Sequence, residues 1–221
     1  GQLSNTYVVL LSDHGELLHD HGLTGKGEFH YDSCVRVPLV IAGPGVNGGR
    51  ARDELVQLED IFPTVLEMTG LPSPDPMLYI RNSTNTAGQY GPSGYPYSPG
   101  RSLLDLCRGD DPIDWRDCAY IEHYNNNMGM DGYDPARGLS APTPVSWARS
   151  VRTEQWRYTM YPDRCGEQLF NMVDDPEETR NLAGDPNYNA VRLEMRDRLL
   201  DLVIKQDYPH SPRSRFSFGI H

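Results

Sequence analysis

The feature that most constrains this chain is an apolar run that ends in a polar turn. Residues 6–11 are apolar without alternation, and Ser12-Asp13-His14-Gly15 follows them directly. A second run, 37–42, stops at a Gly-Pro-Gly turn. Such runs predict strands buried on both faces, and the segment between them is long enough for a parallel crossover. We therefore expect an α/β fold that contains part of a parallel sheet.

A helix is predicted directly after these runs. Residues 60–69 begin with an acidic residue, have Pro63 in the first turn and are followed by Gly70, all of which are typical helix-end signals. The helical period predicts that Ile61, Val65 and Met68 face the sheet. The next segment, 71–100, is rich in Pro, Gly, Ser, Asn and Tyr and favours an exposed loop.

The remainder of the chain predicts a small antiparallel sheet followed by an amphipathic helix. Strand-like segments lie at 118–123, 146–161 (split at 153–155) and 167–172, and the helical period runs through 189–206. A second loop, rich in Gly and Pro, covers 124–144. We expect three parts: a catalytic α/β part at 1–71, a loop or linker at 72–100, and an α+β subdomain at 101–221.

Composition and charge narrow the class of protein. The chain has 221 residues, 38% of them hydrophobic, and a formal charge of −11. A negative surface disfavours binding to nucleic acid, and no apolar run is long enough for a membrane helix. We therefore expect a soluble globular protein that binds neither nucleic acid nor a membrane. The four cysteines have neither zinc-site nor redox-motif spacing and are expected to be free thiols.

Asp13 and His14 follow the first buried run, at the strand end where α/β sheets bind ligands. A carboxylate beside an imidazole can bind a divalent metal, although two ligands are too few and a turn residue explains Asp13 equally well. Lys26, between two glycines, offers a compact positive charge to an anion or is a solvated surface lysine.

Two strings of the sequence resemble the sulfatase family. The first joins Ser12-Asp13-His14-Gly15-Glu16, Asp20-His21-Gly22-Leu23, Lys26 and Arg36-Val37-Pro38-Leu39. The second joins Arg149-Ser150-Val151-Arg152-Thr153, Arg157-Tyr158, Glu167-Gln168-Leu169-Phe170 and Asp175-Pro176-Glu177-Glu178 to Asn181-Leu182-Ala183. Both strings match the carboxyl-terminal part of the family in its order.

This resemblance implies an alkaline-phosphatase-like fold and a site shared with other sequence. It makes Asp13 and His14 metal ligands, and Lys26 the residue that contacts sulfate or phosphate oxygens in catalysis and substrate binding. Calcium is the expected ion, with manganese, magnesium and zinc as alternatives. His30 is a candidate acid for the leaving oxygen, although most histidines are structural. The Asp-His pair resembles the choline-sulfatase and phosphonate monoester hydrolase branch, and His19 stands where the family usually has Gly.

The family's nucleophile is a formylglycine made within a C/S-x-P-x-R motif, and no cysteine or serine of this chain has that context. We therefore expect the carboxyl-terminal part of a sulfuric ester hydrolase, inactive in isolation, whose partners are the missing amino-terminal half and a small sulfate or phosphate ester. A phosphonate or phosphodiester hydrolase is the close alternative. A non-catalytic folding or interaction module, stabilising an oligomer through its loops, is the alternative from another class.

Overall fold

The computed structural model describes residues 2–26, 29–71, 100–112, 114–124, 147–161 and 166–210. It divides into two compact units, one formed by residues 1–9, 40–115 and 200–221, the other by 10–39 and 116–199. The predicted linker at 72–100 lies almost entirely outside the described residues, so the predicted three-part division stays a prediction. No helix within the described ranges is both long and apolar enough to cross a membrane.

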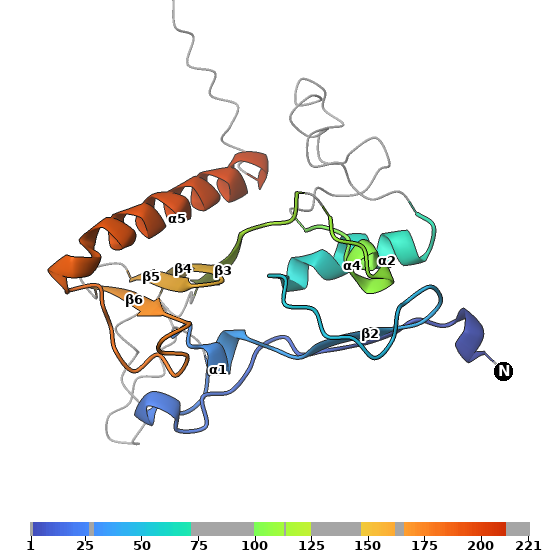
Figure 1. Cartoon of the computed structure of the whole chain (residues 1–221), viewed down its shortest axis with the longest axis horizontal. Coiled ribbons are helices and arrows are strands. Elements are labelled where there is room, and N and C mark those ends of the chain that lie inside the picture. The colour runs from blue at the N-terminus through green and yellow to red at the C-terminus, as the bar shows by residue number, and fades with distance from the viewer. Residues whose placement is uncertain are drawn as a thin grey trace, which may run out of the picture. The chain divides into compact units, whose positions relative to one another are not determined.

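The predicted strands and the two predicted helices are present, together with short helices that the sequence did not predict (Figure 1). The elements in chain order are η1 Leu3–Asn5, β1 Val8–Leu11, η2 Asp20–Gly22, α1 Asp32–Val35, β2 Leu39–Ala42, η3 Leu58–Asp60, α2 Ile61–Met68, α4 Leu104–Arg108, β3 Cys118–Tyr124, β4 Trp147–Thr153, β5 Trp156–Tyr161, β6 Gly166–Asn171, η5 Pro186–Tyr188 and α5 Asn189–His210. This mixture of helices with a carboxyl-terminal antiparallel sheet and helix confirms the predicted fold class.

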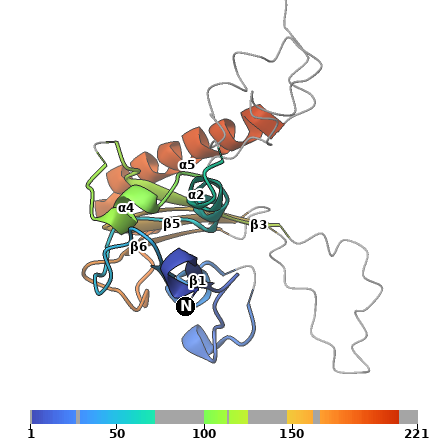
Figure 2. The ribbon, with the colours of Figure 1, turned by 90° about the vertical axis from the view of Figure 1, so that its right-hand side faces the viewer.

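The four-stranded sheet is a meander in the order β3-β4-β5-β6, with every pair antiparallel. Its register places Val151, Tyr158 and Leu169 opposite one another on one face, and all three are fully buried. Helix α5 covers this face (Figures 1 and 2), where Arg192 pairs with Glu167 at 2.7 Å. The side chains of β5 thus alternate between the two faces of the sheet.

Helix α5 buries the stripe that its period predicts. Met195 and Leu199, one turn apart, are buried, whereas Leu200 and Ile204 point to solvent. Glu194 and Arg198, four residues apart on this helix, form an ion pair at 3.4 Å. An amphipathic helix packed on one face of the meander follows from the sequence pattern alone.

The opposite face of the sheet carries polar and charged side chains that are nevertheless buried. Ser150, Arg157 and Thr159 have no exposed surface. The segment around α1 covers them, since His30 bonds Ser150 and Tyr31 packs edge-on against Phe170. This face links the sheet to the loop that carries the candidate site.

Strands β1 and β2 pair with each other in a two-stranded sheet, but the prediction that both faces are buried is wrong. Val8 is 52% exposed, Leu10 60% and Val40 54%. Within the described residues this sheet has two strands, and apolar side chains stay exposed where no neighbouring layer covers them.

Helix α2 is present, but its predicted buried face is also wrong. Val65 is exposed, and Pro63, Thr64 and Leu66 are buried instead. Two hydrogen bonds fix this side: the Arg101 N–H donates to the Asp60 carboxylate at 2.8 Å, and the Leu103 N–H donates to the Thr64 hydroxyl at 2.9 Å. These hydrogen bonds, from residues about forty positions away in the chain, therefore decide which side of α2 is buried, and the apolar period does not.

Candidate active site

The end of β1 brings Asp13 and His14 together, as the sequence predicts. His14 Nε2 lies 3.4 Å from Asp13 Oδ2, and both side chains reach solvent. His14 Nδ1 contacts the Gly15 carbonyl oxygen at 2.8 Å, so this nitrogen carries the proton and donates it. The lone pair of Nε2 is therefore directed toward the same space as the carboxylate.

Lys26, at the other end of the loop that begins at Gly15, contacts this pair. Its Nζ donates to His14 Nε2, the acceptor nitrogen of the ring. Desolvation acts to raise the pKa of Asp13, but the hydrogen bond from the His14 N–H and the positive charge of Lys26 act against it, and this pKa lies below its usual value. The three predicted residues thus form one cluster that holds a carboxylate ionised beside a cation.

Gly15 is required by a close approach of two backbone segments. A Cβ at this position would lie 2.0 Å from the Ser33 carbonyl oxygen. The approach is held by two backbone hydrogen bonds, from Gly15 to Cys34 at 2.7 Å and from Glu16 to Ser33 at 3.1 Å. The strand end with the two candidate ligands is therefore tied directly to α1.

His30 is buried against the meander. It is 2% exposed, and its Nδ1 contacts the Ser150 hydroxyl at 2.6 Å. Burial, with the positive charge of Arg157, lowers the pKa of His30 to about 3 and keeps the ring neutral. Its catalytic role stays a prediction, and burial favours the structural interpretation.

A charged cluster to which no role was assigned from the sequence lies between the meander and α1. Arg157 on β5 is fully buried and pairs with Glu178, which is 4% exposed. Arg157 also lies 4.0 Å from Asp32, the first residue of α1. One signal in the sequence is a charged residue between Trp156 and Tyr158, two aromatic residues of the same strand.

The loop between Gly15 and Lys26 contains unusual backbone conformations. Leu18, His19 and His21 all have positive φ, at 47°, 75° and 50°. A glycine adopts this region without the steric cost that a side chain adds. This explains why the sulfatase pattern has Gly where this chain has His19.

We expect His19→Gly to raise the free energy of unfolding by about 0.5–1 kcal/mol, because removing the left-handed strain outweighs the entropy that glycine adds to the unfolded chain. Thr24→Gly is the matched control, since Thr24 is exposed in the same loop without positive φ. This control should lower stability by about 0.5 kcal/mol. Urea unfolding of both variants tests the prediction, and equal effects would contradict it.

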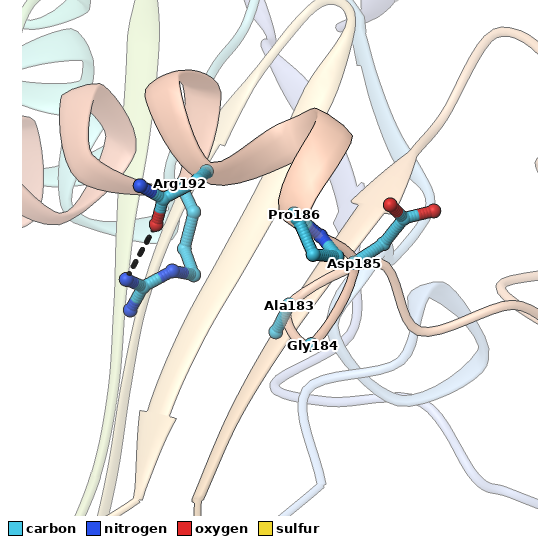
Figure 3. A pocket seen from close by; sticks show the side chains of 6 residues that line it. Ala183, Gly184, Asp185, Pro186 and Arg192 are labelled. Atoms are coloured by element: carbon cyan, nitrogen blue, oxygen red, sulfur yellow. Dashed lines mark hydrogen bonds between the residues drawn. The ribbon is translucent and has the colours of Figure 1, made fainter.

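A surface pocket near the start of α5 does not include any of the predicted site residues (Figure 3). Its polar groups already have partners: Asp185 accepts from the Asn187 N–H at 3.0 Å, and Arg192 binds Asn189 and Glu167. The lining residues are Ala183, Gly184, Asp185, Pro186, Asn189 and Arg192. We therefore attribute this pocket to the start of η5, which Asp185 caps, and to the first turn of α5.

Within the described residues, no group of three or more His, Cys, Asp or Glu side chains gathers as a metal site. In this part of the chain Cys34 and Cys107 are free thiols, as predicted. Asp13 and His14 at the end of β1 are two candidate ligands, fewer than a divalent ion requires.

Family models match most of the chain. Residues 1–71 match the model described as sulfatase, and residues 96–205 match the model described as N-sulphoglucosamine sulphohydrolase, C-terminal. The first covers the cluster at the end of β1, and the second covers the meander and most of α5. These are the two regions in which the sequence resembles the family.

Individual relatives, which are sulfatases and a phosphonate monoester hydrolase, agree with the family models. A Delta 4,5-hexuronate-2-O-sulfatase of Bacteroides thetaiotaomicron is 28% identical over 92% of this chain and 36% of its own length. Arylsulfatase K of Homo sapiens is 30% identical over 82% and 28%. The solved phosphonate monoester hydrolase of Agrobacterium radiobacter is 29% identical, with a TM-score of 0.67, over 90% and 35%.

The chain thus spans about a third of the length of these relatives. Within that third, the matched regions and the shared fold run through nearly every described element. The chain belongs to the sulfatase family, in the alkaline-phosphatase-like superfamily.

Proposed function

We propose that the chain forms the metal-binding and anion-binding half of a sulfuric ester hydrolase, and that it is inactive without an amino-terminal half that supplies the nucleophile. The observation that carries this proposal is the convergence of Asp13, His14 and Lys26 at the end of β1 in a chain of this family. A carboxylate, an imidazole lone pair and an ammonium group are suited to a bound cation and an anionic ester.

The two candidate ligands fit a divalent metal. Ligand atoms on adjacent corners of an octahedron are separated by about 3.0–3.5 Å when metal–ligand distances are about 2.1–2.5 Å. Asp13 Oδ2 and His14 Nε2 are 3.4 Å apart. The bond from His14 Nδ1 to a backbone carbonyl is the usual support of a metal-binding histidine.

Calcium is the ion we propose, with manganese, magnesium and zinc as alternatives, and the remaining ligands would come from the amino-terminal half. When bound, the metal would polarise the ester and activate the nucleophile. Asp13 would hold the ion with its negative charge, and His14 would hold it with Nε2, which Lys26 would release. Lys26 would place its ammonium group on a non-bridging oxygen of the ester, where negative charge increases during the reaction.

The exposed apolar side chains of β1 and β2 support the proposal of an amino-terminal half. Val8, Leu10 and Val40 leave apolar surface on β1 and β2, which a larger parallel sheet would cover. We therefore propose that the amino-terminal half of the same protein completes this sheet and brings its nucleophile, a formylglycine, to the end of β1.

A phosphonate monoester or phosphodiester hydrolase is the second candidate, because the Agrobacterium radiobacter enzyme shares the fold at 29% identity. Both ester classes present one negative charge on a tetrahedral centre, so the same lysine would serve either. The ratio of kcat/KM for an aryl sulfate and a phenyl phosphonate monoester decides between them.

The test uses the full-length protein, stripped with a chelator and reloaded with Ca²⁺ or Mn²⁺. We expect turnover to return with metal, and Asp13→Asn and His14→Gln to lower kcat/KM by roughly a hundredfold or more. Asp20→Asn, in the same loop but outside the cluster, is the matched control and should change little. The 221-residue chain alone should turn over no substrate. Full activity without metal, or in the ligand variants, would disprove the proposal.

A further inference from the structure

The buried charges on the inner face of the meander form a closed arrangement. Arg157 Nη2 pairs with Glu178 Oε1, and Nη1 lies 4.0 Å from Asp32 Oδ1. The guanidinium group lies 5.3 Å from the ring centres of both Tyr31 and Phe170. Arg157 is thus held between two aromatic rings and two carboxylates, with no exposed surface.

This arrangement reaches the site through the backbone of α1. Glu178 Oε2 accepts the Asp32 N–H at 2.7 Å, which fixes the first residue of that helix. Two residues on, the Cys34 carbonyl accepts the Gly15 N–H at 2.7 Å. The Gly15 carbonyl in turn accepts the proton of His14 Nδ1 at 2.8 Å. A continuous series of contacts therefore joins Glu178 to the candidate metal ligand.

A second contact runs through aromatic rings. The Tyr31 ring, 5.3 Å from the guanidinium group of Arg157, stacks on His21 with centres 3.7 Å apart and planes 11° from parallel. His21 belongs to the left-handed segment of the loop between Gly15 and Lys26. The same buried pair is therefore connected to both sides of the loop that carries the cluster.

We propose that the Arg157–Glu178 pair is a positioning element, which fixes α1 and thereby the Gly15 carbonyl that directs Nε2 of His14 toward Asp13. Its value for catalysis rests on the function proposed above, whereas its effect on His14 does not. Glu178 supplies the acceptor for the Asp32 N–H, and Arg157 orients that carboxylate.

Stability alone does not account for these charges. Desolvation lowers the pKa of Arg157, and it raises the pKa of Glu178 to about 7 despite the attraction of Arg157. Both shifts show that burial works against the ionised forms. Apolar side chains of similar volume often replace a buried ion pair without loss of stability, but they cannot accept the Asp32 N–H.

The test compares variants of the 221-residue chain by NMR of ¹⁵N-labelled histidine rings, with His14→Gln to assign the His14 signals. In the wild type we expect the Nδ1–H tautomer of His14 to dominate. Arg157→Met with Glu178→Leu should leave the chain folded and reduce the ratio of Nδ1–H to Nε2–H by roughly fivefold to tenfold, the effect of weakening one hydrogen bond. Arg157→Met with Glu178→Gln keeps an acceptor oxygen and should restore the ratio.

The matched control is Arg192→Met with Glu167→Leu, an ion pair of 2.7 Å on the other face of the same sheet, which should leave His14 unchanged. An unchanged ratio in the Met/Leu variant, or failure of the Met/Gln variant to restore it, would overturn the inference. If the Met/Leu variant does not fold, Glu178→Asp is the second test, because it keeps both charges but carries the carboxylate on a shorter side chain. This variant must lower the ratio of Nδ1–H to Nε2–H of His14. This readout needs neither metal nor turnover, so failure of the proposed function would be seen separately.

Discussion

Arg157→Met alone is expected to lower the free energy of unfolding by about 3–5 kcal/mol at pH 8, whereas adding Glu178→Leu is expected to recover most of that loss. The single variant leaves Glu178, which is 4% exposed, ionised without the guanidinium group. The double variant removes both charges and fills the same space with apolar atoms. Urea-induced unfolding of the wild type and the two variants measures the effect, and equal stability of the two variants would contradict it.

The pH dependence of the single variant provides a control for this explanation. Burial already raises the pKa of Glu178 to about 7 in the folded wild type, from 4.5 in a solvated chain. A carboxyl group with a raised pKa binds its proton more tightly when folded, so it costs stability as the pH rises from about 4.5 to about 7. The groups that face it are Arg157, Asp32 and Arg152.

Without Arg157 this pKa should rise further, because the attraction that lowers it is gone. The Arg157→Met loss should therefore shrink when unfolding is measured at pH 5.5, where the folded variant binds the proton. The double variant lacks this carboxylate, so it should not show that gain. Asp13, Asp117 and Asp175 have lowered pKa values, and their contributions are lost only below about 3.8, outside this window.

The elements of the fold were predicted because their signals are local. Thr153, Glu154 and Gln155 separate two period-two runs, and the structure has the β4–β5 turn there. Which side an element buries is a different matter, because it depends on distant partners. The tether from Leu103 to Thr64 rotates the buried side of α2 away from Val65, and no local period contains that contact.

The candidate site was predictable for a related reason. Asp13, His14 and Lys26 lie within fourteen residues of one another, so a single loop closes them into a cluster. Arg157 and Glu178 lie far from that loop in the sequence, and alternation along β5 assigns Arg157 to a polar face without showing that this face is covered. Small polar neighbours at Ser150 and Thr159 are the signal of a buried polar layer, visible only once the register is known.

Lys26→Ala in the full-length protein is expected to lower kcat/KM by about a hundredfold and stability by only about 0.5 kcal/mol. The side chain is exposed, so little packing is lost and the surface value applies. In a site closed to water, a positive group that faces developing negative charge contributes roughly 3 kcal/mol to the transition state, which corresponds to that loss in rate.

Lys26→Arg should restore only part of the activity. The Nζ of Lys26 meets His14 Nε2 at the end of a flexible stem, and a planar guanidinium group cannot place its charge at the same point. Arg180→Ala is the matched control, since it removes a cation that is 71% exposed elsewhere on the surface and should leave kcat/KM unchanged. The measurements are kcat/KM and the urea unfolding midpoint for all three variants. Near-normal kcat/KM in Lys26→Ala would show that the contact with His14 is a surface hydrogen bond and that the anion is held by other groups.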